Sequence, residues 1–164
     1  MDNINKLNGK LSAPVFSKKD ILLSYRMLNH YDEMGLLIGK RDNIKQWRKF
    51  NGFDYIWINI IIILREIGVP LKKIKYLKTK LFEEGRSGNI DKANFINQSF
   101  QEEVLSSIID KYELYLLVFY DNSYTFHDST SLNQCHNGVY KNEPHINIPL
   151  SNIISEVIDK HKEI

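Results

Sequence analysis

The chain has 164 residues, of which 43% are hydrophobic and 26% are charged, and this is the composition of a globular protein rather than a disordered one. Its longest apolar stretch, around Ile60–Leu64, is interrupted by Asn59 and is far shorter than the roughly 20 residues of a membrane-spanning helix. The N-terminus lacks the apolar core of a secretion signal, and the single Cys135 excludes an internal disulfide. These features predict a cytoplasmic protein that contacts no membrane.

The net charge of +2 conceals a strong asymmetry between the two halves of the chain. Residues 1–81 contain 16 basic and 7 acidic residues, a formal charge of +9, whereas residues 82–164 contain 6 and 13, a charge of −7. A basic half is where a polyanion such as nucleic acid would bind, although many basic surfaces are only solvated. The asymmetry therefore favours a division of tasks between two domains.

The N-terminal half begins with residues 1–15, which are polar and lack a period, so we expect a flexible arm. Ser17 and Asp20 have the spacing of a capping box and predict a short helix. Ser24 is the N-cap candidate of a second helix, which Gly35 ends. Residues 38–52 are short, cationic and bracketed by glycines, a pattern that predicts a β-hairpin or wing.

Two further helices complete this half. Asp54 is the expected cap of a nearly continuous apolar helix that ends near Gly68, and Pro70 marks the start of the next one. The stretch 83–91 is rich in Gly, Ser and Asn, so it is the predicted linker. The expected architecture of this half is helix, helix, hairpin, helix, helix.

The C-terminal half shows a different pattern. A helical stripe precedes the apolar strand candidate 112–120, a turn leads to the alternating segment 123–127, and a loop from Asp128 to Pro144 leads to a third strand candidate at 145–148. Ser151 is the expected cap of a last helix. The predicted fold class is α+β. The chain is expected to consist of an arm (1–15), a winged helix-turn-helix domain (16–82), a linker (83–91) and an acidic α-β-β-β-α domain (92–164). We expect the last domain to serve dimerisation or effector binding.

The second helix carries side chains suited to reading DNA. Its apolar positions Met27, Leu28 and Tyr31 are expected to hold it on a core, which leaves the outward arc Tyr25, Arg26, Asn29 and His30. Asn can bond adenine and Arg can bond guanine in the major groove. The hairpin that follows is cationic and contains aromatic residues, with Lys40, Arg41, Lys45, Arg48 and Lys49 around Trp47 and Phe50.

These residues resemble the DNA-binding domain of the MerR family of bacterial transcription regulators. The segments "YRMLNHYDEMGLL", "KR", "WRKF" and "FDYIWINIIIILREIGVPLKKIKYL" follow that family's pattern in order and spacing over roughly residues 16–80. The resemblance implies that Tyr25, Arg26 and His30 lie at the groove, that Tyr31 contacts the DNA backbone or packs, and that Arg41, Arg48 and Phe50 serve the wing. Asn29-His30 replaces the family's Arg-Tyr pair, the first helix is compressed, and no sustained heptad supports the family's usual dimerisation helix.

Other residues have simpler interpretations. Arg65 can cap a helix end or contact a phosphate, and the aromatic residues of the C-terminal strands can form a core or an effector pocket. The loop 127–145 contains His127, Cys135, His136 and His145 without the close ligand spacing of a zinc site. No catalytic motif is present, so we expect no enzyme activity, no cofactor and no metal.

The sequence therefore predicts a transcription regulator that binds double-stranded DNA as a homodimer, with RNA polymerase or a small-molecule effector as possible further partners. One alternative is an excision or directionality factor that bends DNA for a mobile element. The other is a protein-interaction module that has kept the fold and lost DNA binding.

Overall fold

The computed structural model describes residues 2–39, 48–83, 99–138 and 140–162. Within these ranges it contains helices and one small antiparallel sheet, which confirms the α+β class. The chain divides into two compact units, residues 1–69 with 153–164 (unit 1) and residues 70–152 (unit 2). No helix in the described ranges is both long and apolar enough to cross a membrane.

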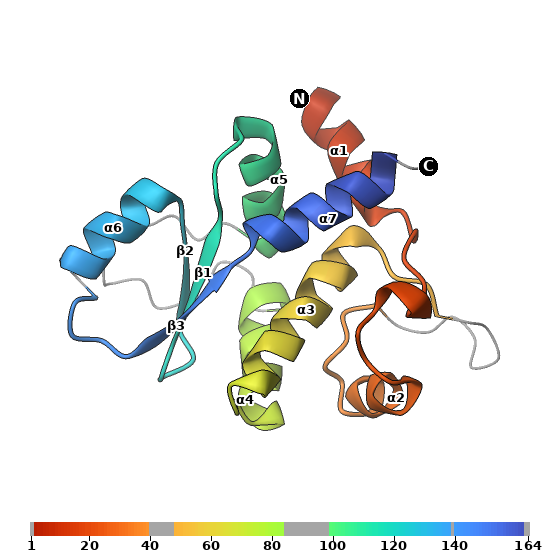
Figure 1. Ribbon diagram of the computed structural model, residues 1–164, viewed down its shortest axis with the longest axis horizontal. Helices are drawn as coiled ribbons and strands as arrows, with labels where there is room; N and C mark the ends of the chain where they lie inside the picture. The colour runs from red at the N-terminus through yellow and green to blue at the C-terminus, as the bar shows by residue number, and fades with distance from the viewer. Residues whose placement is uncertain (1, 40–47, 84–98, 139, 163–164) are drawn as a thin grey trace. The chain divides into compact units, whose positions relative to one another are not determined.

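Unit 1 is helical and has its core along α3 (Figure 1). Trp57, Ile60, Ile61 and Leu64 of this helix are fully buried, and each such side chain contributes roughly 1.5–3 kcal/mol to folding. The helix α1 packs against α3. The elements of this unit are α1 (Asp2–Ser12), the 3-10 helix η1 (Lys18–Asp20), α2 (Tyr25–Glu33), α3 (Gly52–Glu66) and α7 (Ser151–Lys162), whose first two residues count with unit 2.

Unit 2 contains a three-stranded antiparallel sheet with the order β2-β1-β3. The central strand pairs Leu117 with Thr125 on one side and with Asn147 on the other. Helix α6 follows β2 and packs beside it (Figure 1). The elements are α4 (Leu71–Lys78), the π-helix η2 (Thr79–Glu83), α5 (Phe100–Asp110), β1 (Tyr115–Phe119), β2 (Tyr124–His127), α6 (Ser129–Asn137) and β3 (His145–Pro149).

The structure differs from the predicted elements in two places. The expected arm 1–15 contains α1, because Leu7 and Leu11 lie four residues apart and Leu11 is buried in unit 1. The expected loop after Asp128 contains α6, which begins with a capping box between Asp128 and Ser131. Both helices are mostly polar and contain few apolar residues, so neither segment looks like a core helix in the sequence.

Two predicted helix caps also need correction. The N-cap of α3 is Asn51, and Asp54 is the third helical residue of the same capping box. Ser151 lies inside α7, and its Oγ accepts a hydrogen bond of 3.1 Å from the backbone of Leu114. The expected ends at Gly35 and Gly68 are confirmed, since both have positive φ angles, 70° and 87°.

The compact units also differ in extent from the predicted domains. The segment Pro70–Glu83 groups with unit 2, and Ile153–Lys162 returns to unit 1. Most of the predicted linker, residues 84–91, lies outside the described residues.

Candidate nucleic-acid interface

Helix α2 is held by one cap and one buried side. Ser24 accepts a hydrogen bond of 3.1 Å at its Oγ from the backbone of Met27, which starts the helix as predicted. Leu28 and Tyr31 are 5% and 3% exposed and form its inner side. Three residues after Tyr31 the helix ends at its C-cap, Met34.

The opposite side of α2 is exposed and polar. Arg26, His30 and Glu33 are exposed, and Asn29 is half-buried. At 100° per residue, these four positions lie on one arc of the helix, opposite Leu28 and Tyr31. We call Arg26, Asn29, His30 and Glu33 the outer face of α2. It presents donors, acceptors and both signs of charge at the surface of the molecule.

Two apolar side chains flank the outer face. Tyr25 is 48% exposed, and its position agrees with the predicted outward arc. Met27 is 43% exposed, so the prediction that it holds the helix on its core is wrong. Its spacing fitted an apolar stripe, but only Leu28 and Tyr31 within α2 are buried.

The chain before α2 is ordered by a short capped turn. Ser17 and Asp20 form the predicted capping box, and Ser17 Oγ donates to the Asp20 carboxylate at 2.8 Å. The resulting helix η1 has only three residues. Phe16, just before it, forms an isolated antiparallel bridge with Phe50 through backbone hydrogen bonds of 2.9 and 2.8 Å. This bridge brings the two ends of the segment around α2 together.

Arg48 lies inside unit 1 rather than on a basic surface. Its Nη1 atom is 2.6 Å from a carboxylate oxygen of Asp32, and its side chain is only 10% exposed. Its Nη2 atom donates to the carbonyl of Gly39, and the guanidinium lies 5.4 Å from the centre of the Phe50 ring. The predicted DNA contact of Arg48 is therefore not supported, because its guanidinium is already used within the protein.

Asp54 completes this arrangement at the start of α3. Its carboxylate accepts the backbone hydrogen bond of Asn51 at 3.1 Å. Burial raises the pKa of Asp54 above its usual value, while the Asn51 hydrogen bond, the charge of Arg48 and a hydrogen bond from Gly39 act in the opposite direction. We call Asp32, Gly39, Arg48 and Asp54 the Arg48 junction, since together they fix the end of α2 against the start of α3.

The remaining predicted contacts divide into three groups. Tyr31 and Phe50 are 3% and 1% exposed, so both are core residues. Tyr31 therefore packs, which was one of its two interpretations, and the burial of Phe50 does not support its listing among the DNA-binding residues. Lys49 is exposed, in agreement with a surface cation. Lys40 and Arg41, with most of the predicted wing, lie outside the described residues.

Arg65 has the structural role that was one of its two interpretations. Its Nη1 atom donates at 2.7 Å to the carbonyl of Val69, beyond the end of α3. A cation here also faces the negative end of the helix dipole. This arrangement favours a helix-ending role over a phosphate contact.

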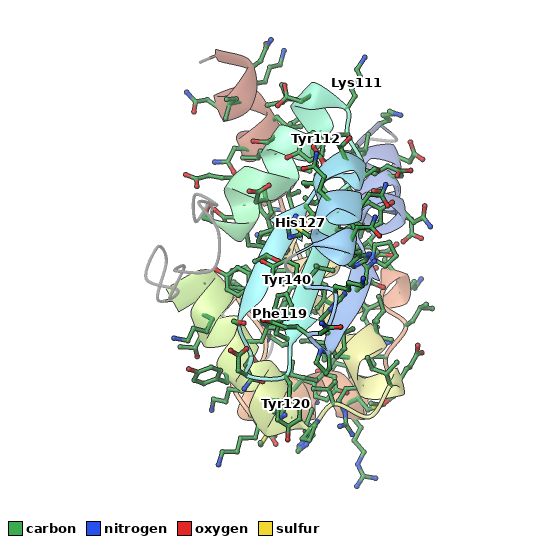
Figure 2. All side chains as sticks on the ribbon, turned by 90° about the vertical axis from the view of Figure 1, so that its left-hand side faces the viewer. Lys111, Tyr112, Phe119, Tyr120, His127 and Tyr140 are labelled. Carbon is green, nitrogen blue, oxygen red and sulfur yellow. The ribbon has the colours of Figure 1, made fainter. Side chains whose placement is uncertain are left out.

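Unit 2 brings the predicted histidine and cysteine loop together around a tyrosine. The ring of Tyr140 lies 4.7 Å from that of Phe119 and 6.0 Å from that of His127, and Figure 2 shows these three side chains along the sheet. His127 is buried, and burial lowers its pKa below the usual value. Its Nε2 lies 2.9 Å from the Thr125 hydroxyl, and its Nδ1 lies 3.8 Å from Cys135 Sγ.

The same loop contains a pair of histidines that the sequence did not single out as a pair. His136 Nε2 and His145 Nε2 are 3.0 Å apart. Their nine-residue separation spans the end of α6 and the start of β3, so only the fold places them together. No group of three or more His, Cys, Asp or Glu side chains is arranged to hold a metal within the described ranges.

Glu33 is the other residue that the sequence analysis missed. It lies seven residues after Arg26 and therefore on the same side of α2, where it adds a negative charge to the outer face. The helical spacing alone could have identified it. A comparison of the chain with protein-family models, curated proteins and solved structures finds no match in any of the three.

Proposed function

We propose that this protein is a DNA-binding transcription regulator that contacts duplex DNA through the outer face of α2. The observation that carries the proposal is the segregation of α2 into a buried side, with Leu28 and Tyr31, and an outer side with Arg26, Asn29 and His30. A helix of this kind fits the major groove, where Arg and Asn side chains distinguish base pairs.

The segments around α2 support a helix-turn-helix arrangement. The turn η1 precedes α2, and the bridge between Phe16 and Phe50 closes the segment that contains both. The wing that the resemblance to MerR regulators implies, residues 38–52, is kept as part of this proposal, although residues 40–47 lie outside the described ranges. Lys49 is exposed next to the bridge, where a phosphate contact would support the helix.

Unit 2 would then provide dimerisation or effector binding. Two copies of the chain would place two α2 helices on an inverted repeat, with half-sites about one helical turn apart. The sheet of unit 2 has two edge strands, β2 and β3, and a second chain could pair with one of them. Contacts with RNA polymerase or a small effector also belong to this proposal.

The test measures binding of the full chain to a labelled random duplex by fluorescence anisotropy at about 50 and 200 mM salt. We expect affinity to fall steeply with salt, because binding releases counterions from the DNA. Arg26→Ala should weaken binding by about five- to 150-fold, which corresponds to about 1–3 kcal/mol for a base-reading arginine. Glu33→Gln should strengthen binding, because it removes a negative charge from the same face.

Lys141→Ala provides the matched control. It removes one exposed positive charge, as Arg26→Ala does, but from unit 2. Its binding should equal that of the wild type. Equal losses in both variants would mean that only overall charge matters, and wild-type binding that is absent even at low salt would rule out the DNA-binding proposal.

A further inference from the structure

We infer that His136 and His145 form a binding site for a divalent transition-metal ion of the Zn²⁺ type in unit 2. The two imidazoles approach each other through their Nε2 atoms, 3.0 Å apart. Two metal–nitrogen bonds of roughly 2.0–2.1 Å, at angles between a right angle and a tetrahedral one, place two nitrogens about 2.9–3.4 Å apart. The observed separation therefore lets one ion bind both rings with little movement.

The orientation of His145 is fixed by a second hydrogen bond. Its Nδ1 atom lies 2.8 Å from the backbone carbonyl of Glu143, and a carbonyl can only accept. Nδ1 therefore carries the proton of the neutral ring, and Nε2 presents its lone pair to His136. Metal-binding histidines commonly have this arrangement, in which the ring nitrogen that does not bind metal donates to a backbone carbonyl.

The surrounding structure holds both rings in place. His145 starts β3 and pairs in register with Phe119 of the central strand, whose ring lies 5.5 Å from the imidazole. His136 lies in the last turn of α6, and the two imidazole planes are inclined by 26°. Both side chains are half-buried, so an ion can reach them from solvent.

The remaining coordination positions would belong to water or to a small external ligand. No third His, Cys, Asp or Glu completes a metal-binding group in the described part of the chain. An open site with two imidazoles favours Zn²⁺, Ni²⁺ or Cu²⁺, and it disfavours Mg²⁺ and Ca²⁺, which prefer oxygen ligands.

Without metal, the pair shares one hydrogen bond. Because His145 Nε2 has the lone pair, His136 Nε2–H must donate to it. When an ion binds, this proton moves to Nδ1 of His136, so both Nε2 lone pairs face the metal and both rings stay neutral.

The experiment titrates the tag-free full chain with ZnCl₂ by isothermal titration calorimetry and with Cu²⁺ by electron paramagnetic resonance. We expect one ion per chain and a copper spectrum with hyperfine splitting from two nitrogens. His136→Ala and His145→Ala should each weaken binding by about tenfold or more. MgCl₂ should give no binding heat.

Asn137→Ala is the matched control, because Asn137 is an exposed neighbour in the same helical turn. It should bind as the wild type does. Circular dichroism verifies that each variant folds, and His136→Gln, which keeps a polar side chain, repeats the test if His136→Ala does not. Absence of zinc binding by the wild type, or binding unchanged in both folded histidine variants, would overturn the inference. Neither outcome affects the DNA-binding proposal, which rests on unit 1.

Discussion

The outer face of α2 and the Arg48 junction meet at the end of α2, where Asp32 of the junction lies between His30 and Glu33 in the chain. Each contains an arginine that the sequence pattern assigned to DNA. Arg26 is exposed beside Asn29 and His30. Arg48 is 10% exposed and is bound to Asp32 and to the carbonyl of Gly39. A cation can neutralise a phosphate only if its hydrogen-bond donors are available, so the two arginines have different tasks although they look equivalent in sequence.

The contrast follows from what surrounds each side chain. The start of α3 places Asp54 near Gly39 and Arg48, and the end of α2 supplies Asp32. Arg is suited to such a position because its planar fork can satisfy two acceptors at once. On the outer face of α2, by contrast, Arg26 is exposed to solvent, with Asn29 one turn and Glu33 two turns further along the helix.

The largest expected effect comes from breaking the Arg48 junction. Arg48→Ala removes the guanidinium from Asp32 and from the Gly39 carbonyl. It should lower the free energy of unfolding by about 2–4 kcal/mol, less than for a fully buried pair because Asp32 is 28% exposed. Urea unfolding followed by tryptophan fluorescence measures this change. Both tryptophans precede residue 69, so their signal reports on unit 1.

Lys49→Ala is the control for Arg48→Ala, because it removes a neighbouring cation that lies outside the Arg48 junction. Lys49 is the adjacent cation on the surface, and its removal should change the free energy of unfolding by less than about 0.5 kcal/mol. If Arg48→Ala were as stable as Lys49→Ala but bound DNA more weakly, Arg48 would be a DNA contact after all.

Two glycines of unit 1 allow the same comparison between a packed position and an open one. A Cβ atom at Gly52 would lie 2.8 Å from Val157 Cγ1 and 3.2 Å from the Leu11 carbonyl, so Gly52→Ala should destabilise the protein by about 1–3 kcal/mol. At Gly9, in α1, no atom of the described residues lies within 4 Å of an added Cβ, apart from those of its chain neighbours and its own helix backbone. Gly9→Ala should stabilise the helix by roughly 0.5–1 kcal/mol.

Thermal unfolding of the two glycine variants measures this difference, with Gly9→Ala as the control for the loss of backbone freedom. A Gly52→Ala variant as stable as the wild type would show that α1 and α7 do not pack on the start of α3 as described. The same result would weaken the assignment of residues 153–162 to unit 1.

The smallest effect concerns the acid sensitivity of His161, on the inner side of α7. Its ring lies 6.2 Å from Phe16, and its buried Nε2 has no hydrogen-bond partner within the described residues. Burial, and to a lesser extent Lys10, lowers its pKa below the usual value. The unfolded chain therefore binds the proton more readily, so this contribution to stability is complete above about pH 6.5 and is lost as pH falls below it.

Unfolding free energies measured between pH 7.5 and 5 should therefore decline less steeply in His161→Gln than in the wild type. A repeat at high salt is the control, because salt screens Lys10 but leaves burial unchanged. Identical pH profiles for the two proteins would argue against a buried His161.

Local sequence signals were sufficient to predict several of the helix ends and one strand. Ser24 and Gly35 delimit α2, Gly68 ends α3, and the apolar segment 112–120 contains β1. Such signals work because caps, positive φ angles and strand propensity act over a few residues. The helices α1 and α6 were missed because each is mostly polar and buries few side chains, Leu11 in α1 and Leu132 and Cys135 in α6.

The sequence by itself determined the α+β class, the C-terminal ends of α2 and α3 and the exposed positions Arg26 and His30. Only the tertiary structure decided that Arg48 is a junction residue, that Tyr31 and Phe50 are buried, and that His136 meets His145. The physical reason is the separation along the chain between the residues that interact. Caps and turns depend on near neighbours in the chain, whereas burial, ion pairing and the contact between two imidazoles depend on residues that only folding brings together.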